Sequence, residues 1–236
     1  MQLVKYLAHL GYGSRKQIMQ LIRDGHVANV HGQTLTAEAP FVHEEILFNG
    51  QPLDPPQGMC AMLHKPIGYT CSHGDAGPLI YDLLPPRWRQ RKPKISSIGR
   101  LDRDTSGLLL LTDDGALLHR LISPRASIPK CYEATLSEDL RGNETEIFAS
   151  GTLLLRSEQT PLKPATMETL GRRHVRLTLY EGRYHQVRRM FAAVNNHVLT
   201  LHRHAIAGLQ MNASLTEGKW TLLSPHQRTI LDKSPE

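Results

Sequence analysis

The densest group of reactive side chains lies just before a run of leucines. Arg100, Asp102 and Arg103 stand between Gly99 and the leucines of residues 108–111. Flanking cations favour the ionised form of a carboxyl group, which makes Asp102 a candidate nucleophile or electrostatic catalyst. The same residues could instead form a surface turn in which Asp102 only pairs with its arginine neighbours. Spacing alone leaves both interpretations open.

Other catalytic classes fit this stretch less well. An Asp-x-Asp pair can hold magnesium or start phosphoryl transfer, but here Thr105 directly follows Asp104 and no continuous apolar strand precedes Asp102. The chain has no phosphate-binding loop ending in Gly-Lys-Ser/Thr, and the Gly-Tyr-Gly of residues 11–13 follows no predicted strand. Nucleotide hydrolysis and dinucleotide binding are therefore not indicated.

A second group of polar side chains spans residues 180–191. A helix is predicted to begin near Tyr184, and its apolar inner stripe is then made of Tyr184, Val187, Phe191 and Val194. Arg188 and Arg189 then face solvent or phosphate, and Arg183 lies at a strand-to-helix junction. His185 could act as a base, but a histidine near a helix start is more often held by a structural hydrogen bond. We therefore assign it no chemistry.

The elements that position these residues follow from the spacing of apolar side chains. Residues 3–10 and 14–22 predict two short helices, and the alternation after residue 25, with turns at 31–32 and 49–50, predicts a hairpin. The proline-rich residues 55–58 predict a linker. Strands are predicted beyond it at residues 61–64, 107–112, 132–136, 175–180 and 197–202. Helices are predicted at residues 117–122, 144–149, 184–194 and 225–231, the last capped by Ser224. The chain is therefore expected to be of the α+β class.

Composition narrows the classes of partner. The 236 residues include 28 Lys or Arg and 22 Asp or Glu, so the net charge is 28 − 22 = +6, which suits a polyanionic partner. Apolar residues make up 40%, which is typical of a globular protein. No apolar run is long enough to span a bilayer, and residues 1–10 do not form a secretion signal. A cytoplasmic protein without a membrane partner is expected.

Two further features concern metals and phosphates. Cys60, Cys71 and Cys131 leave one thiol unpaired in any disulfide scheme and match no common zinc spacing, so they are interpreted as reduced thiols. Residues 85–94 hold five cations around Trp88 and are a candidate phosphate-contact loop. The alternative is a solvated surface loop.

Several motifs, taken in order, resemble the signature of pseudouridine synthases. They are Gly-Arg-Leu-Asp at residues 99–102 with Gly-Leu-Leu at 107–109, Thr-Asp-Asp-Gly at 112–115, Lys-Cys-Tyr at 130–132 and Glu-Gly-Arg-Tyr-His-Gln-Val at 181–187. Residues 64–69 resemble the Asn-Lys-Pro-x-Gly stretch of these enzymes, with His64 in place of Asn. The tract from residue 190 to 203 is similar to the ribosomal small-subunit pseudouridine synthase A family. Gln2 and Val4 depart from the basic residue and the aspartate usual there, which bears on the choice of target.

The resemblance implies a two-domain enzyme that isomerises uridine within RNA. Residues 1–54 correspond to an S4-like RNA-binding domain, 55–58 to a linker and 59–236 to a catalytic domain with a mixed or antiparallel sheet. Asp102 matches the catalytic aspartate, Arg183 the basic residue that pairs with it, and Tyr132 the tyrosine that stacks on the base. The family's reaction needs no cofactor and no metal.

The resemblance also implies the partner. It is 16S ribosomal RNA or an assembling small-subunit particle, bound by a monomer, with the uridine 516 type of site in the 530 stem-loop region as target. The alternatives are a synthase for a 23S site and a noncatalytic RNA-binding assembly factor. The predicted RNA contacts are Arg15, Lys16, Arg23, Lys65, Arg87, Arg89, Arg91, Lys92, Lys94, Arg100, Arg103, Arg188 and Arg189.

Overall fold

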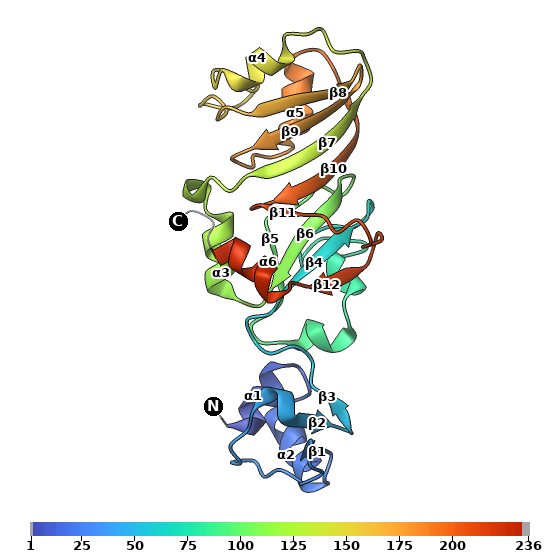
Figure 1. Ribbon diagram of the computed structural model, residues 1–236, viewed down its shortest axis with the longest axis vertical. Coiled ribbons are helices and arrows are strands. Elements are labelled where there is room, and N and C mark those ends of the chain that lie inside the picture. Colours follow the sequence, from blue (N-terminus) through green and yellow to red (C-terminus); the bar gives the residue numbers. More distant parts are fainter. Residues whose placement is uncertain (1, 233–236) are drawn as a thin grey trace.

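The computed structural model describes residues 2–232. Two helices and a small sheet form one end of the molecule (Figure 1). The elements are α1 (Leu3–His9), α2 (Arg15–Arg23), β1 (Val27–Asn29), η1 (His43–Glu45), β2 (Ile46–Phe48) and β3 (Gln51–Pro52). Ser14 and Gln17 form a capping box at the start of α2. Asn49 and Gly50 both have positive φ and close the β2–β3 hairpin, which confirms the turn predicted there.

The rest of the described chain is built on a mixed sheet. Its strands are β4 (Cys60–Lys65), β5 (Ser96–Ile98), β6 (Ser106–Thr112), β7 (Lys130–Leu136), β8 (Thr166–Gly171), β9 (His174–Leu179), β10 (Val198–Ile206), β11 (Leu209–Gln210) and β12 (Trp220–Leu222). Their order is β12-β4-β6-β10-β7-β9-β8, with β5 on β6 and β11 on β10. β6 and β10 run parallel, whereas the other pairs are antiparallel.

Helices cover both faces of this sheet (Figure 1). Successive residues of β4 and β6 alternate between two apolar clusters, so these two strands are buried on both faces. One cluster includes Leu117 and Leu121 of α3 (Gly115–Ile122) and Leu231 of α6 (Pro225–Asp232). The other cluster includes side chains of α4 (Glu144–Ala149) and α5 (Gln186–Ala193), together with the short helices η2 (Ile80–Leu83) and η3 (Pro86–Gln90). η4 (Pro124–Ala126) follows α3.

The observed elements confirm most of the predicted ones. The α+β class is confirmed, as are the six predicted helices, the Ser224 cap and the five strands predicted beyond the linker. β8 and the short strands β5, β11 and β12 were not predicted. α5 begins at Gln186 rather than near 184, because His185 has a φ of 48° in the left-handed region and cannot continue a helix. In residues 2–232, no helix is long and apolar enough to cross a membrane.

Candidate active site

Asp102 lies in the loop that joins β5 to β6, and a buried lysine holds this loop. Nζ of Lys65 donates hydrogen bonds to the backbone oxygens of Asp102 (3.1 Å), Thr105 (2.8 Å) and Pro66 (3.0 Å). Lys65 is fully buried, and this burial lowers the pKa of its ammonium group. The three carbonyl oxygens replace the water that the ammonium has lost. The predicted phosphate contact at Lys65 is therefore wrong, because this side chain positions the Asp102 loop from within the core.

A cavity of about 360 Å³ opens beside Asp102 and is lined by several segments that are distant in sequence. Asp102 comes from the β5–β6 loop, Tyr132 from β7, Arg183 from the β9–α5 loop and Arg203 from β10. The volume lies within the range of small-ligand sites. The fold thus brings the three predicted catalytic residues, Asp102, Tyr132 and Arg183, to the wall of one cavity.

Tyr132 contributes to the cavity from within the sheet. It is only 9% exposed, and its direct cross-strand neighbours are Leu177 on β9 and Arg203 on β10. Opposite residues on antiparallel strands share one face of the sheet. The Tyr132 ring and the Arg203 guanidinium therefore lie on the same face, toward the cavity.

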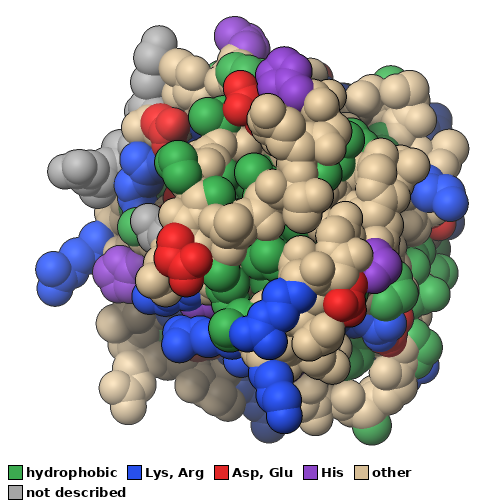
Figure 2. Space-filling view, turned by 90° about the horizontal axis from the view of Figure 1, so that it is seen from below, with side chains coloured by type: hydrophobic (Ala, Val, Ile, Leu, Met, Phe, Trp, Pro, Cys, Tyr) green, Lys and Arg blue, Asp and Glu red, His purple; other side chains and the backbone are tan. Residues whose placement is uncertain are grey.

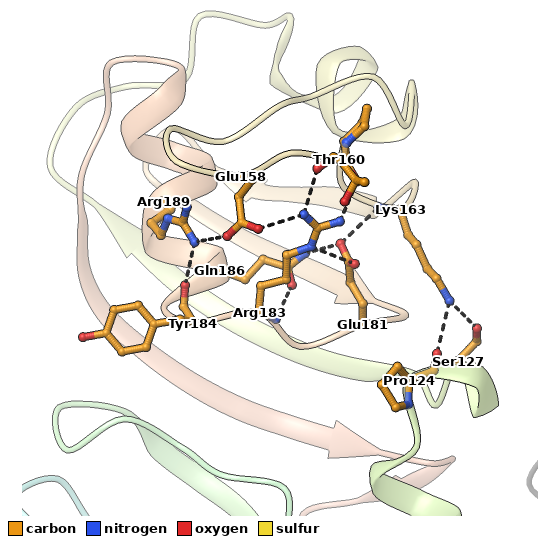
Figure 3. Close-up of polar contacts among 11 residues, drawn as sticks. Pro124, Ser127, Glu158, Thr160, Lys163, Glu181, Arg183, Tyr184, Gln186 and Arg189 are labelled. Atoms are coloured by element: carbon orange, nitrogen blue, oxygen red, sulfur yellow. Dashed lines mark hydrogen bonds and ion pairs between the residues drawn. The ribbon is translucent and has the colours of Figure 1, made fainter.

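The predicted ion pair between Arg183 and Asp102 is not formed. The Arg183 guanidinium donates to Glu158 Oε2 and Glu181 Oε2 (both 3.2 Å), to Thr160 O (2.8 Å) and to Pro161 O (2.6 Å). Figure 3 shows this arrangement, in which Arg183 ties the loop of residues 156–161 to the start of α5. The prediction is wrong for the pairing, because these carbonyl oxygens and carboxylates satisfy the guanidinium first.

His185 takes the position beside Asp102 that the sequence assigned to Arg183. Its Nε2 atom lies 3.5 Å from Asp102 Oδ1, and the two side chains are 37% and 30% exposed. A protonated imidazole at this distance forms an ion pair with the carboxylate. We assigned no chemistry to His185 from the sequence, and the left-handed backbone that turns it toward Asp102 leaves no signal there.

Two cations that sequence reasoning missed line the same cavity, the half-buried Lys130 and the buried Arg203. Burial and repulsion from Arg203 lower the pKa of Lys130 to about 8, and its Nζ donates to Ile128 O (2.8 Å). Arg203 is 1% exposed, its Nε donates to Leu108 O (2.8 Å), and its Nη2 has no hydrogen-bond partner among the described residues. Buried charge without a counter-ion is costly, so this wall of the cavity suits a negatively charged group. The Lys-x-Tyr spacing of residues 130–132 was the available signal, since it places both side chains on one face.

A second cavity adjoins the first on the other side of the Asp102 loop. Its volume is about 700 Å³, and it shares Arg100, Leu101, Asp102 and His185 with the first cavity. Ile67 and Gly68, which follow β4, line its opposite side. Asp102 therefore stands between two adjoining hollows, and Arg100 reaches both.

The other predicted phosphate contacts divide by exposure. The exposed ones are Arg15, Lys16, Arg23, Arg87, Arg89, Lys92, Lys94, Arg100 and Arg103. Arg188 and Arg189 are half-buried and pair with Asp104 (2.9 Å) and Glu158 (2.7 Å). Figure 2 looks onto the end of the molecule where α1 and α2 lie, and Lys and Arg side chains gather there over the lower left part while acidic side chains are scattered.

Arg91 does not belong to this exposed set. It is 1% exposed and donates two hydrogen bonds to Asp113 Oδ2 (2.9 and 2.7 Å), one to Pro55 O (2.8 Å) and one to Pro56 O (2.9 Å). The predicted phosphate contact at Arg91 is wrong. The run of charges in residues 85–94 concealed that one of its members turns inward.

Cys71 lines the second cavity, where its Sγ atom donates to Leu101 O (3.4 Å), whereas Cys60 packs in the apolar cluster beneath α3 and α6. All three are free thiols, and burial raises the pKa of Cys60 to about 12, which keeps it protonated. In the described part of the chain, no three His, Cys, Asp or Glu side chains meet as a metal site would require.

Comparison with known proteins places the chain among RNA-modifying enzymes. Residues 60–193 match the RNA pseudouridylate synthase family. The chain is 40% identical over 236 residues to a ribosomal small subunit pseudouridine synthase A from Pasteurella multocida, covering 99% of this chain and 100% of the relative. It is 42% identical over 187 residues to the Escherichia coli protein of that name, covering 78% of each. A crystal structure of a pseudouridylate synthase superposes with a TM-score of 0.70 at 37% identity, covering 98% of this chain and 99% of that one. The chain belongs to the ribosomal small subunit pseudouridine synthase A family of RNA pseudouridylate synthases.

Proposed function

We propose that this chain isomerises one uridine of 16S ribosomal RNA to pseudouridine, with the uridine 516 type of site in the 530 stem-loop region as its target. The observation that carries the proposal is the cavity shared by Asp102 and Tyr132. Its wall also holds the half-buried Lys130 and the buried Arg203. The names of the relatives, which refer to the small ribosomal subunit, support the choice of RNA.

Asp102 and Tyr132 carry the central chemistry in this proposal. The reaction breaks the bond between N1 and C1′, turns the base and joins C5 to C1′. The proton on C5 leaves and N1 gains one, so atoms balance without a co-reactant. The Asp102 carboxylate stabilises the positive charge that develops at the anomeric carbon, as carboxylates of glycosidases do. The Tyr132 ring stacks on the uracil, and its hydroxyl accepts the C5 proton.

The cations of the cavity have a matching role. Uracil that has lost its bond to the sugar carries negative charge on its nitrogen and carbonyl oxygens. Lys130 and Arg203 lie where they stabilise that charge in a partly dry site. His185 flanks the Asp102 carboxylate with its Nε2 atom, and Arg183 acts by holding the loop of residues 156–161 rather than by touching Asp102.

RNA binding is assigned to both ends of the molecule. A stacked uridine must be flipped out to reach the cavity, at a cost of about a few kcal/mol that protein contacts have to offset. Arg100, which borders both cavities, is proposed to fill the vacated space. The exposed cations of α2 and of the 87–94 loop are proposed to contact phosphates. We propose residues 1–54 as an S4-like RNA-binding domain, 55–58 as a linker and 59–236 as the catalytic domain, since residues 3–53 form an apolar cluster of their own.

The target is tested by mapping pseudouridines in ribosomal RNA from cells that lack this protein. Loss of one pseudouridine from the 530 stem-loop of 16S RNA, restored by the wild-type gene and not by Asp102→Asn, is the expected result. Loss from 23S RNA instead would refute the proposed target. An unchanged map in both RNAs would refute the proposed function and favour a noncatalytic assembly factor.

A further inference from the structure

The rim of the catalytic cavity carries an aromatic ring that the chemistry described above does not use. Tyr184 lines the cavity yet is 70% exposed, although the sequence predicted it on the buried stripe of a helix. Because His185 adopts a left-handed conformation and α5 begins only at Gln186, Tyr184 is turned out of the core. Figure 3 shows its ring directed away from the ion-pair network of Arg183 and Glu158.

The exposed ring is held in a defined position. It stacks on the His185 imidazole with centroids 3.9 Å apart and planes 15° apart. Arg189 Nη1 donates to Tyr184 O (3.2 Å), and the same nitrogen donates to Glu158 Oε1 (2.7 Å). Gln186, which is buried, accepts from the backbone N–H of Arg183 (2.9 Å) and donates to Glu181 (2.9 Å). The backbone on both sides of Tyr184 is therefore fixed before any ligand arrives.

The geometry points to a second base-binding subsite: we propose that the Tyr184–His185 stack receives the base of a nucleotide adjacent to the target uridine. This inference rests on the proposed function. Flipping a nucleotide out of a strand leaves its neighbours without a stacking partner. One face of the Tyr184 ring is covered by His185, and a 70%-exposed ring at the cavity rim offers its remaining surface to such a base. Aromatic rings stack on any base, so the subsite positions RNA without reading its sequence.

The stack also connects this subsite to the reacting centre. His185 contacts the Tyr184 ring on one side and lies 3.5 Å from Asp102 Oδ1 through its Nε2 atom. A base on Tyr184 would thus fix the register of the strand relative to Asp102. Arg100, exposed and lining the same cavity, adds positive charge near the RNA path, which favours a nucleic acid over an apolar protein segment as the occupant.

The test compares substitutions of exposed tyrosines in the full chain. Tyr184→Ala should lower kcat/KM for tritium release from C5-tritiated 16S transcript by about 10- to 100-fold, the range expected for one lost base stack. Tyr184→Phe should retain activity, because stacking needs the ring and not the hydroxyl. Tyr180→Ala is the matched control, since Tyr180 is 39% exposed, nearby in the chain and outside both cavities.

A binding measurement separates this inference from the proposed function. In the Asp102→Asn background, Tyr184→Ala should weaken affinity for fluorescently labelled 16S transcript about 10- to 100-fold, while Tyr180→Ala should not. This readout does not need turnover, so absence of tritium release from the wild type would refute the proposed function alone. If Tyr184→Ala has the affinity and kinetics of the wild type, the proposed base-binding subsite is refuted, and a protein partner becomes the occupant to test.

Discussion

Among single residues, Lys130 makes the charge of the cavity depend on pH. Burial, and then repulsion from Arg203 and Lys163, lower the pKa of its ammonium group from 10.5 to about 8. Between these two values the unfolded chain holds a proton that the folded chain has released. The folded state therefore gains stability as the pH rises from 8 to 10.5, and loses that gain as the pH falls.

We expect Lys130→Met to abolish this gain. Urea unfolding near pH 7.5 and pH 10 should show the wild type gaining about 1–2 kcal/mol relative to the variant, less than the full shift because the partly exposed ammonium is screened. Comparing differences between the two proteins cancels the titration of groups they share. An equal difference at both pH values would contradict the burial of this charge.

Individual residues of the site also show what could and could not be predicted from the sequence. The order of motifs was enough to place Asp102 and Tyr132 in one cavity. It could not show the partners of charged side chains, because those of Lys65 and Arg183 include backbone oxygens that no residue type encodes. The sequence also could not predict that Arg91 is buried, because its neighbours in sequence carry the same charge and are exposed.

At the scale of elements, the parallel contact of β6 and β10 depends on Gly107. Its φ is +118°, and a Cβ atom there would lie 2.5 Å from the backbone nitrogen of Arg203. Backbone atoms cannot move aside as a flexible side chain does. Gly107→Ala must therefore strain the backbone and separate the two strands that hold Arg203 and the end of the Asp102 loop.

The expected loss for Gly107→Ala is about 3 kcal/mol or more in the free energy of unfolding, measured in urea. Gly74→Ala is the control, since a Cβ at Gly74 meets nothing within 4 Å and the residue has no positive φ. If Gly107→Ala and Gly74→Ala unfold at the same urea midpoint, the close contact of β6 and β10 at Gly107 does not contribute to stability and the prediction is wrong.

Elements with a strong apolar period were predicted, and those without one were not. β4, β6, β7, β9 and β10 were recognised because buried residues recur along them. β8 was missed because Met167 is its one buried residue, as befits a strand at the sheet edge. The start of α5 was misplaced because a left-handed conformation at His185 is unusual for a residue other than glycine.

On the scale of the whole molecule, Arg91 ties the segment after β3 to the main sheet. Its guanidinium joins Asp113, just after β6, to the carbonyl oxygens of Pro55 and Pro56. Asp113 also accepts from Gly58 N (2.9 Å), and the ion pair is at most 1% exposed. Removing one partner of such a pair leaves the other charged and buried.

Arg91→Met should therefore cost about 3–5 kcal/mol in the free energy of unfolding and make residues 55–58 more sensitive to proteases. Arg89→Met provides the comparison, since its pair with Asp82 has side chains 42% and 49% exposed. That change should cost less than about 1 kcal/mol. Equal losses in both variants would argue that the buried pair does not hold the two parts together.

The division into two domains stays a prediction at this scale, although its physical basis is visible. The N-terminal apolar cluster draws its members from residues 3–53, and Pro55–Pro56 follows directly in sequence. Composition predicted the linker, but not that Arg91 would fasten it, because the contact joins residues 35 and 36 positions apart.

The central claim is that the carboxylate of Asp102 drives uridine isomerisation in small-subunit RNA. It is tested most directly by incubating wild type and Asp102→Asn, in parallel, with C5-tritiated 16S and 23S transcripts and counting the tritium released to water. We predict release of one equivalent from 16S RNA by the wild type, none from 23S RNA, and none above background with Asp102→Asn. Equal release by the two proteins would contradict the account.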